Sequence, residues 1–173
     1  MELTSNNSIA KTKKIILTPP SSNDGFEVNQ LIKSCPPLDT NSLYCNLLQC
    51  HHFSSTSMCA RYQNDLVGFV SGYIVPDQPD TLFIWQVAIS DSMRGQGLAG
   101  NMILKILNNE SCKNIKYLQT TVTATNKSSL RFITKLSHDL SANLKSATLF
   151  SKEKHFNHLH ESEELITIGP FKQ

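Results

Sequence analysis

The sequence predicts a single α/β domain built on one β-sheet, and three observations support this prediction. Strand-like and helix-like segments alternate from residue 14 to residue 168 without an internal repeat. The chain has 173 residues, which suits one domain with a substantial core. Residues 81–107 predict a buried strand, a glycine-containing turn and a helix, in that order. Residues 1–13 are rich in Ser, Asn and Lys and are expected to form a flexible tail, which leaves 14–173 as the domain.

A first strand is followed by two helices. The apolar run at 14–18, closed by two prolines, predicts the strand. Apolar side chains at mostly helical spacing predict a helix at 24–34, and its possible N-caps are Ser22, Asn23 and Asp24. After a proline-containing turn, Ser42 is expected to cap a second helix that ends at Cys50.

A hairpin and the central unit come next. Segments 57–62 and 66–75 flank a turn and predict a hairpin, and Gly68 and Gly72 in its second strand indicate a bulge or the close approach of another group. The remaining expected elements are a strand at 82–89, a helix from Gly100 to Leu107, a strand at 117–123, a helix at 127–136 and two short strands at 147–151 and 165–168.

Composition argues against several functional classes. Hydrophobic residues make up 39% and charged residues 17%, as in globular rather than disordered chains. A net charge of +2 without a long basic block gives no reason to expect a nucleic-acid partner. No apolar stretch reaches the roughly 18 residues of a membrane span, and no signal peptide is evident. The five cysteines lack a C-x-x-C pair, so we expect free thiols in a reducing cytoplasm.

The turn between the central strand and the following helix has the features of an anion site. The start of a helix leaves several backbone N–H groups without internal partners, and the helix dipole favours negative charge there. Gly95 and Gly97 would let the backbone approach a phosphate, and Arg94 can add positive charge. The alternative is a strand-to-helix turn that needs glycine twice only for its backbone angles.

Several motifs together resemble a known family. The segment 94–99, RGQGLA, fits the R/Q-x-x-G-x-G/A signature of the Gcn5-related N-acetyltransferase family. The wider match resembles the branch of that family that acetylates L-2,4-diaminobutyrate in ectoine synthesis, and it covers roughly residues 15–171. Its further motifs are Pro36-Pro37-Leu38-Asp39-x-Asn41-Ser42-x-Tyr44, Phe83-x-Trp85-Gln86-Val87-Ala88, Thr121-Val122-Thr123-x-x-Asn126, His160-Glu161-x-Glu163 and Ile168-Gly169-Pro170. Ala124 departs from the proline expected in many relatives.

The resemblance implies a fold, an activity and partners. The fold is a single domain with a mixed, mostly antiparallel sheet, a splayed central strand pair and helices on both faces. The activity is acetyl transfer from acetyl-CoA to the 4-amino group of L-2,4-diaminobutyrate, without a metal, in a cytoplasmic homodimer. The alternatives are an acetyltransferase of the same fold with another small amine or a protein amine as acceptor, and a non-catalytic acyl-CoA-binding module.

The resemblance also assigns site residues. The implied acceptor-binding residues are Asp39, Tyr44, Trp85, His160 and Glu163, of which His160 and Glu163 are also the candidate catalytic groups. The implied cofactor-binding residues are Val87, Ala88, Ile89, Arg94, Gly95, Gln96, Gly97, Leu98, Ala99 and Asn126.

Each assignment competes with a structural alternative. Asp39 suits a turn, Asn126 suits a helix N-cap, and Tyr44 and Trp85 suit a core. The side chains of Val87 and Ile89 are expected in the sheet core, because their proposed role uses main-chain groups only.

The roles of two glutamates in the polar loop before the last strand stay open, and so does the acid for the leaving thiolate. Its histidines suggest zinc, but it has neither a thiolate pattern nor a helical H-E-x-x-H motif. Glu161 and Glu164 could exchange roles through a register shift of one residue. No tyrosine follows Asn126, so the acid that reprotonates the leaving thiolate stays unassigned.

Overall fold

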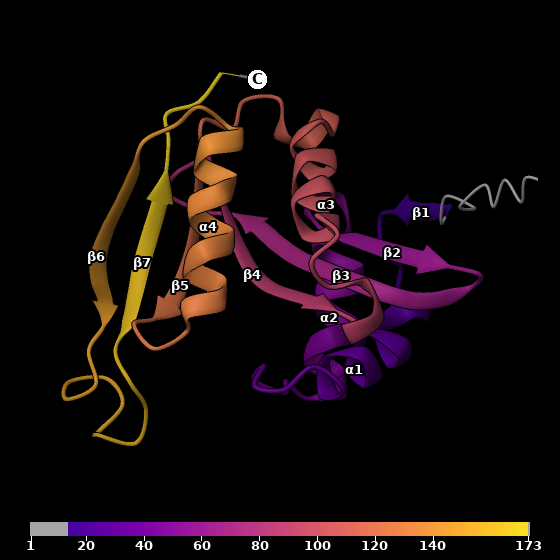
Figure 1. Ribbon diagram of the computed structural model, residues 1–173, viewed down its shortest axis with the longest axis horizontal. Coiled ribbons are helices and arrows are strands. Elements are labelled where there is room, and N and C mark those ends of the chain that lie inside the picture. The colour runs from indigo at the N-terminus through magenta and orange to yellow at the C-terminus, as the bar shows by residue number, and fades with distance from the viewer. Residues whose placement is uncertain (1–13, 173) are drawn as a thin grey trace, which may run out of the picture.

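Residues 14–172 are described by the structure, a computed structural model, and they form one seven-stranded sheet flanked by helices (Figure 1). The tail expected at 1–13 lies outside the described residues. The strands are β1 (Ile15–Thr18), β2 (Met58–Tyr62), β3 (Asp65–Ile74), β4 (Thr81–Ile89), β5 (Tyr117–Thr123), β6 (Leu144–Phe150) and β7 (Glu163–Ile168). The helices are α1 (Gly25–Lys33), α2 (Leu43–His52), α3 (Leu98–Leu107) and α4 (Lys127–Asp139).

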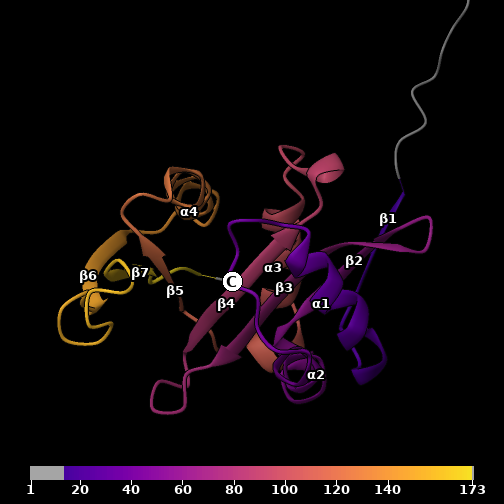
Figure 2. The same cartoon turned by 90° about the horizontal axis from the view of Figure 1, so that it is seen from below.

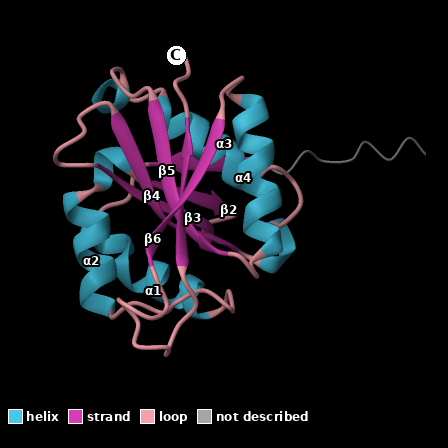
Figure 3. Cartoon of the chain, turned by 90° about the vertical axis from the view of Figure 1, so that its left-hand side faces the viewer, coloured by secondary structure: helices cyan, strands magenta, loops and turns pink. Residues whose placement is uncertain are grey.

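The sheet has the order β1-β2-β3-β4-β5-β7-β6, and every neighbouring pair is antiparallel except β4 and β5. Strands lie between the α1–α2 pair and the α3–α4 pair (Figure 3). The predicted mixed sheet with helices on both faces is therefore confirmed.

Apolar side chains build a core on each face of the sheet. The larger core joins α3 and α4 to the sheet through residues such as Met102, Ile106 and Ile133. The smaller core joins α1 to the sheet through Val28, Ile32 and Phe69. Because both faces are covered, the central strands are apolar on both sides and lack a simple two-residue alternation.

Several element boundaries differ from the sequence prediction. Helix α3 begins at Leu98 rather than Gly100, directly after Gly97, which has a φ of +75° and so ends the turn. Helix α4 runs on to Asp139, and β6 starts at Leu144. The Ser42 hydroxyl caps α2 as predicted, by accepting from the Cys45 N–H.

Of the three N-caps predicted for α1, Asp24 occupies the N-cap position, but its side chain makes no capping hydrogen bond to this helix. Ser21 supplies the side-chain cap, for a short 3-10 turn at 22–24, and accepts from the Asn23 N–H. Asp24 completes the reciprocal capping box by accepting from the Ser21 N–H at 2.7 Å. The extra turn therefore places the side-chain cap at Ser21, upstream of the helix proper.

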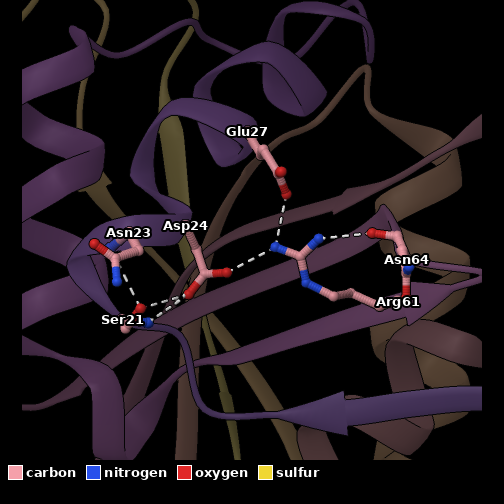
Figure 4. A network of polar contacts seen from close by, with 6 residues as sticks. All are labelled: Ser21, Asn23, Asp24, Glu27, Arg61 and Asn64. Carbon is pink, nitrogen blue, oxygen red and sulfur yellow. Dashed lines mark hydrogen bonds and ion pairs between the residues drawn. The ribbon is translucent and has the colours of Figure 1, made fainter.

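A cluster of ion pairs fixes this helix start to the hairpin (Figure 4). The Arg61 guanidinium lies 2.7 Å from Asp24 and 2.6 Å from Glu27, and it also donates to the Asn64 carbonyl. Burial of Asp24 opposes ionisation, but hydrogen bonds from Arg61 and Ser21 outweigh it and hold the pKa of that carboxyl below its ordinary value. The cluster thus ties β2 to the start of α1.

Both glycines singled out in β3 lie beside irregularities. Ala60 pairs with Gly68 and Arg61 with Leu66, so one residue of β3 bulges between them. At Gly72, a Cβ would lie 2.8 Å from the Phe83 carbonyl oxygen. The bulge and the close approach predicted from these glycines are confirmed.

A second bulge lies in β4 and changes which way its side chains point. Ser71 pairs with Gln86 but Gly72 pairs with Ile84, which leaves Trp85 as the extra residue. One extra residue shifts the alternation of the strand. Ile84 therefore packs into the α3–α4 core, whereas Ala88 packs into the α1 core.

Candidate active site

The sheet splits at its centre. β4 and β5 pair only from Thr81 to Phe83, opposite Tyr117 to Gln119, and then diverge. In the view from below, α4, β5, β7 and β6 lie on one side of β4, and β1 to β3 with α1 and α2 lie on the other (Figure 2). A cleft of about 1460 Å³ opens along the split, and both strands line it beyond the last paired residues. The splayed strand pair that was predicted is present.

The glycine turn forms part of the cleft wall. Gly95 and Gly97 have φ values of +73° and +75°, in the left-handed region that favours glycine. A Cβ at either position would meet no atom of residues 14–172 within 4 Å, so the space above the turn is open. The backbone angles thus explain both glycines, and the open space leaves room for a ligand against the main chain.

Two polar side chains brace this turn. Arg94 donates from Nε to the Ile89 carbonyl at 3.1 Å and pairs with Asp91 at 2.8 Å. Gln96 donates to the Ser92 carbonyl and lies outside the cleft lining, unlike Arg94. Arg94 therefore combines a structural role with a position at the cleft, whereas the Gln96 side chain is turned to the Ser92 carbonyl.

The exposed edge of β4 carries the main-chain groups predicted to hold a cofactor. Val87 and Ile89 line the cleft, whereas the Ala88 side chain is buried on the opposite face. The Ile89 carbonyl already accepts from the Cys35 thiol at 3.3 Å as well as from Arg94. Main-chain contact with a ligand is consequently more open at Val87 than at the Ile89 carbonyl.

Helix α4 forms the opposite wall and adds positive charge. Asn126 accepts from the Ser129 N–H at 3.1 Å and so caps the helix, as its structural alternative predicted, while also lining the cleft. The cationic residues of α4 that line the cleft recur every four residues and are Lys127, Arg131 and Lys135. Residues four apart share one helix face. The sequence analysis missed them, although the spacing was visible in the sequence.

Asp39 and Trp85 reach the cleft from two segments far apart in sequence. Asp39 is exposed in the loop before α2. Trp85 is 44% exposed, with its ring edge-to-face against Tyr73 at 6.3 Å, so the core interpretation of this tryptophan is wrong. The bulge at Trp85 accounts for its position out of the core.

The loop before β7 brings His160, Glu161 and Glu163 to the same cleft. Glu161 accepts from the Thr125 hydroxyl at 2.7 Å. Nδ1 of His160 lies 2.8 Å from the Glu161 carbonyl oxygen, which can only accept, so Nδ1 donates. In the neutral ring, Nε2 is then the nitrogen free to take a proton.

Glu164 and Tyr44, which the sequence analysis considered for the acceptor site, do not lie in the cleft. Glu164 points to β6, where the hydroxyls of Thr148 and Ser146 donate to it at 2.8 and 3.5 Å. Tyr44 is 69% exposed on the first turn of α2 and is absent from the cleft lining. The structure therefore does not bring Tyr44 together with the other four predicted acceptor residues.

Neither a metal cluster nor a cleft tyrosine is found in the part of the chain that the structure describes. No group of three His, Cys, Asp or Glu side chains within residues 14–172 is placed to hold a metal ion. The cleft lining formed by these residues includes no tyrosine, but it includes His160 and the carboxylates of Asp39, Glu161 and Glu163. No helix in that range is long and apolar enough to cross a membrane.

Comparison with known proteins agrees with this geometry. The Acetyltransferase (GNAT) family matches residues 26–137, more than half of the chain. L-2,4-diaminobutyric acid acetyltransferase from Methylotuvimicrobium alcaliphilum is 48% identical over 91% of this chain and 92% of its own length. The enzyme of the same name from Vibrio parahaemolyticus is 41% identical over 91% of this chain and 87% of its own.

A solved structure is also similar over nearly the whole chain. Diaminobutyrate acetyltransferase EctA from Paenibacillus lautus, in complex with its substrate L-2,4-diaminobutyric acid and coenzyme A, superposes with a TM-score of 0.88 at 34% identity. The similarity covers 94% of this chain and 98% of that one. With the split sheet, the glycine turn and these relatives in agreement, the chain belongs to the acetyltransferase (GNAT) family.

Proposed function

We propose that this protein transfers the acetyl group of acetyl-CoA to the 4-amino group of L-2,4-diaminobutyrate and so makes N4-acetyl-L-2,4-diaminobutyrate for ectoine synthesis. The observation that carries the proposal is the parting of β4 from β5 after Phe83, which opens one cleft onto both the glycine turn and three carboxylates. The relatives named for this reaction, at 48% and 41% identity, support the choice of acceptor.

The cleft is large enough for two substrates. Sites for one drug-sized ligand measure about 300–1,000 Å³. A volume of about 1460 Å³ leaves room for a long cofactor and a short diamine together. Its lining is mixed, with apolar strand residues, cations from α4 and carboxylates from the loops.

The cofactor phosphates fit the turn and α4. Gly97 is the N-cap residue of α3 and has no side chain that could accept from the first main-chain N–H groups of the helix. These groups therefore favour an anion. Arg94 and Arg131 add positive charge nearby on the cleft wall. Bound acetyl-CoA supplies the activated acyl group, and an N–H on the unpaired edge of β4 near Val87 is placed to donate to its carbonyl oxygen as negative charge develops there.

The acceptor amine needs acidic neighbours. A lysine-like amine has a reference pKa of about 10.4, so it is protonated at neutral pH and must lose a proton before it attacks. Asp39 and Glu163 attract the ammonium groups, and Trp85 forms a wall beside them. Glu163 or Nε2 of His160 then accepts the proton that the amine releases.

An acceptor panel tests the proposal. Release of CoA thiol is measured with diaminobutyrate, ornithine, lysine and a peptide with a free amino terminus, and NMR of the product locates the acetyl group. We expect kcat/KM to be highest for diaminobutyrate, with acetylation at N4. Equal rates for diaminobutyrate and lysine would refute the narrow substrate assignment, and CoA binding without turnover on any amine would favour a non-catalytic module.

A homodimer in the cytoplasm completes the proposal. All seven residues of β6 are exposed, and the strand forms the outer edge of the sheet. The apolar side chains there and in the adjoining loop include Leu144, Leu149, Phe150 and Leu159. A second copy would cover such an edge, which is otherwise prone to uncontrolled pairing. None of the five cysteines, all of which lie within residues 14–172, forms a disulfide, which suits a reducing compartment.

A further inference from the structure

We propose that Gln86 is a positioning residue that clamps the loop at 36–41 against the wall of the cleft and thereby sets the selectivity for the acceptor amine. Its role in selectivity rests on the proposed function, since it acts through Asp39. The clamp itself is a property of the fold and can be tested separately.

Both ends of the Gln86 amide bind this loop. Nε2 donates to the Asp39 carbonyl at 2.9 Å, and Oε1 accepts from Nδ2 of Asn41 at 3.0 Å. Gln86 is 7% exposed, so these two bonds are made away from water, where an unpaired amide is costly. One side chain thus fixes the residues on both sides of Thr40.

The loop has few other attachments. The Leu38 N–H donates to the Cys35 carbonyl, and Nδ2 of Asn29 donates to the Asn41 carbonyl at 3.1 Å. Pro36, Pro37 and Asp39 are exposed. Leu38 packs against the α1 core just before Asp39. Without Gln86, the main chain from Asp39 to Thr40 would have no hydrogen bond to the rest of the fold within residues 14–172.

The β4 bulge is what aims Gln86 at the loop. Before Trp85, the side chain of Ile84 faces the α3–α4 core, and an unbroken alternation would send Gln86 to that same face. The extra residue reverses the alternation, so Gln86 shares the α1 face with Ala88. The bulge therefore presents Trp85 to the cleft and Gln86 to the loop at adjacent positions.

A row of buried amides anchors the far side of the clamp. Asn29 bridges from the Asn41 carbonyl to Oδ1 of Asn46 at 2.8 Å, and Asn46 donates to Oε1 of Gln49 at 2.9 Å. These three side chains are 2% exposed or less. Although Nε2 of Gln49 has no partner among residues 14–172, the three hydrogen bonds of this row join α1, α2 and the loop, and shifting the loop would leave more buried amide groups unpaired.

The consequence for the reaction is geometric. An ammonium anchor displaced by about 1 Å can cost on the order of a hundredfold in rate. Gln86 also lines the cleft, but both ends of its amide are engaged by the loop that carries Asp39, so its loss should affect the acceptor more than acetyl-CoA. That difference separates a clamp from a general contribution to stability.

The principal test compares Gln86→Met with Ser71→Ala. Ser71 pairs with Gln86 across β3 and β4, is fully buried, and its Oγ has no hydrogen-bond partner among residues 14–172, so its loss controls for a buried polar deletion at the same place. In Gln86→Met, we expect the KM for diaminobutyrate to rise about tenfold, the size of two lost hydrogen bonds, and the preference over ornithine to shrink. The KM for acetyl-CoA should stay within about twofold in both variants.

A second variant and a second measurement keep the test decisive if Gln86→Met folds poorly. Asn41→Ala removes one arm of the clamp from a half-buried site, and should shift the KM for diaminobutyrate in the same direction by less. Hydrogen exchange of the amides at 38–42, which follow the two prolines, should quicken in Gln86→Met and Asn41→Ala and remain unchanged in Ser71→Ala.

The outcomes separate the two proposals. If the wild type does not acetylate diaminobutyrate but exchange at 38–42 still quickens in the Gln86 and Asn41 variants, the substrate assignment fails and the clamp stands. If exchange is unchanged, or if the KM for acetyl-CoA rises as much as that for diaminobutyrate, the clamp is refuted whatever the substrate.

Discussion

Gly97→Ala tests where the cofactor binds, because its two effects can be calculated from the local geometry. Gly97 has a φ of +75° and ψ of 6°, and a Cβ added there meets no described atom within 4 Å. The only cost to folding is therefore the left-handed backbone, roughly 1–2 kcal/mol for a residue with a Cβ. For a domain of this size, that lowers Tm by about 2–8 °C.

The effect on binding is separable from that strain. If the cofactor lies against the turn, the new methyl group occupies its space, and CoA affinity should fall by at least about tenfold, or about 1.4 kcal/mol. Gly97→Asn is the matched variant, because asparagine tolerates positive φ but also carries a side chain. It should retain more of the thermal stability and still bind CoA poorly.

Trp85 is the only tryptophan and lines the cleft, so its fluorescence reports CoA binding, with calorimetry as an independent measure. Gly100→Ala serves as a stability control, since Gly100 is helical, lacks positive φ and has no described neighbour within 4 Å of an added Cβ. This variant should gain up to about 1 kcal/mol of stability. Wild-type CoA affinity in both Gly97 variants would refute the location of the cofactor on this turn.

Three further predictions follow from other parts of the structure. Glu163→Gln should lower kcat by about 10²–10⁴-fold if Glu163 takes the proton, with CoA affinity unchanged in the fluorescence titration; full activity would leave His160 as the base. Arg61→Met should destabilise the fold by on the order of 1 kcal/mol in urea unfolding at neutral pH. In the folded protein, the pKa of Asp24 lies below its ordinary value of 3.8. The stability that the ionised carboxylate contributes is therefore present above pH 3.8 and is lost as the pH falls through the folded pKa, so the difference in stability between wild type and Arg61→Met should shrink in acid. A difference in stability that does not depend on pH would contradict the assigned pairing. Leu149→Lys on the β6 edge should convert the proposed dimer to monomer in sedimentation equilibrium. The control is Phe26→Lys, which changes an exposed apolar residue on α1 and should leave the assembly unchanged. Loss of the dimer in Phe26→Lys alone would place the interface elsewhere.

The sequence alone was sufficient for the features that depend on neighbouring residues. Hydrophobic spacing located every strand and helix to within a few residues, and Ser42 was identified as a cap because capping acts over three positions. The RGQGLA segment indicated the glycine turn, since its backbone angles are dictated locally. The combination of short motifs also indicated the family, which the comparisons confirm.

Only the tertiary structure decided how distant segments meet. The bulge at Trp85 arises from the pairing of β4 with β3. The family resemblance assigned Trp85 to the acceptor site, but strand periodicity favoured the core, and nothing in the sequence predicted that Gln86 would face the α1 layer. Tyr44 and Glu164 were placed away from the cleft, and Arg131 was placed on it, by the packing of whole elements. Local preferences fix backbone angles and caps, but the direction of a side chain in a paired sheet depends on register, which contacts between residues far apart in the chain determine.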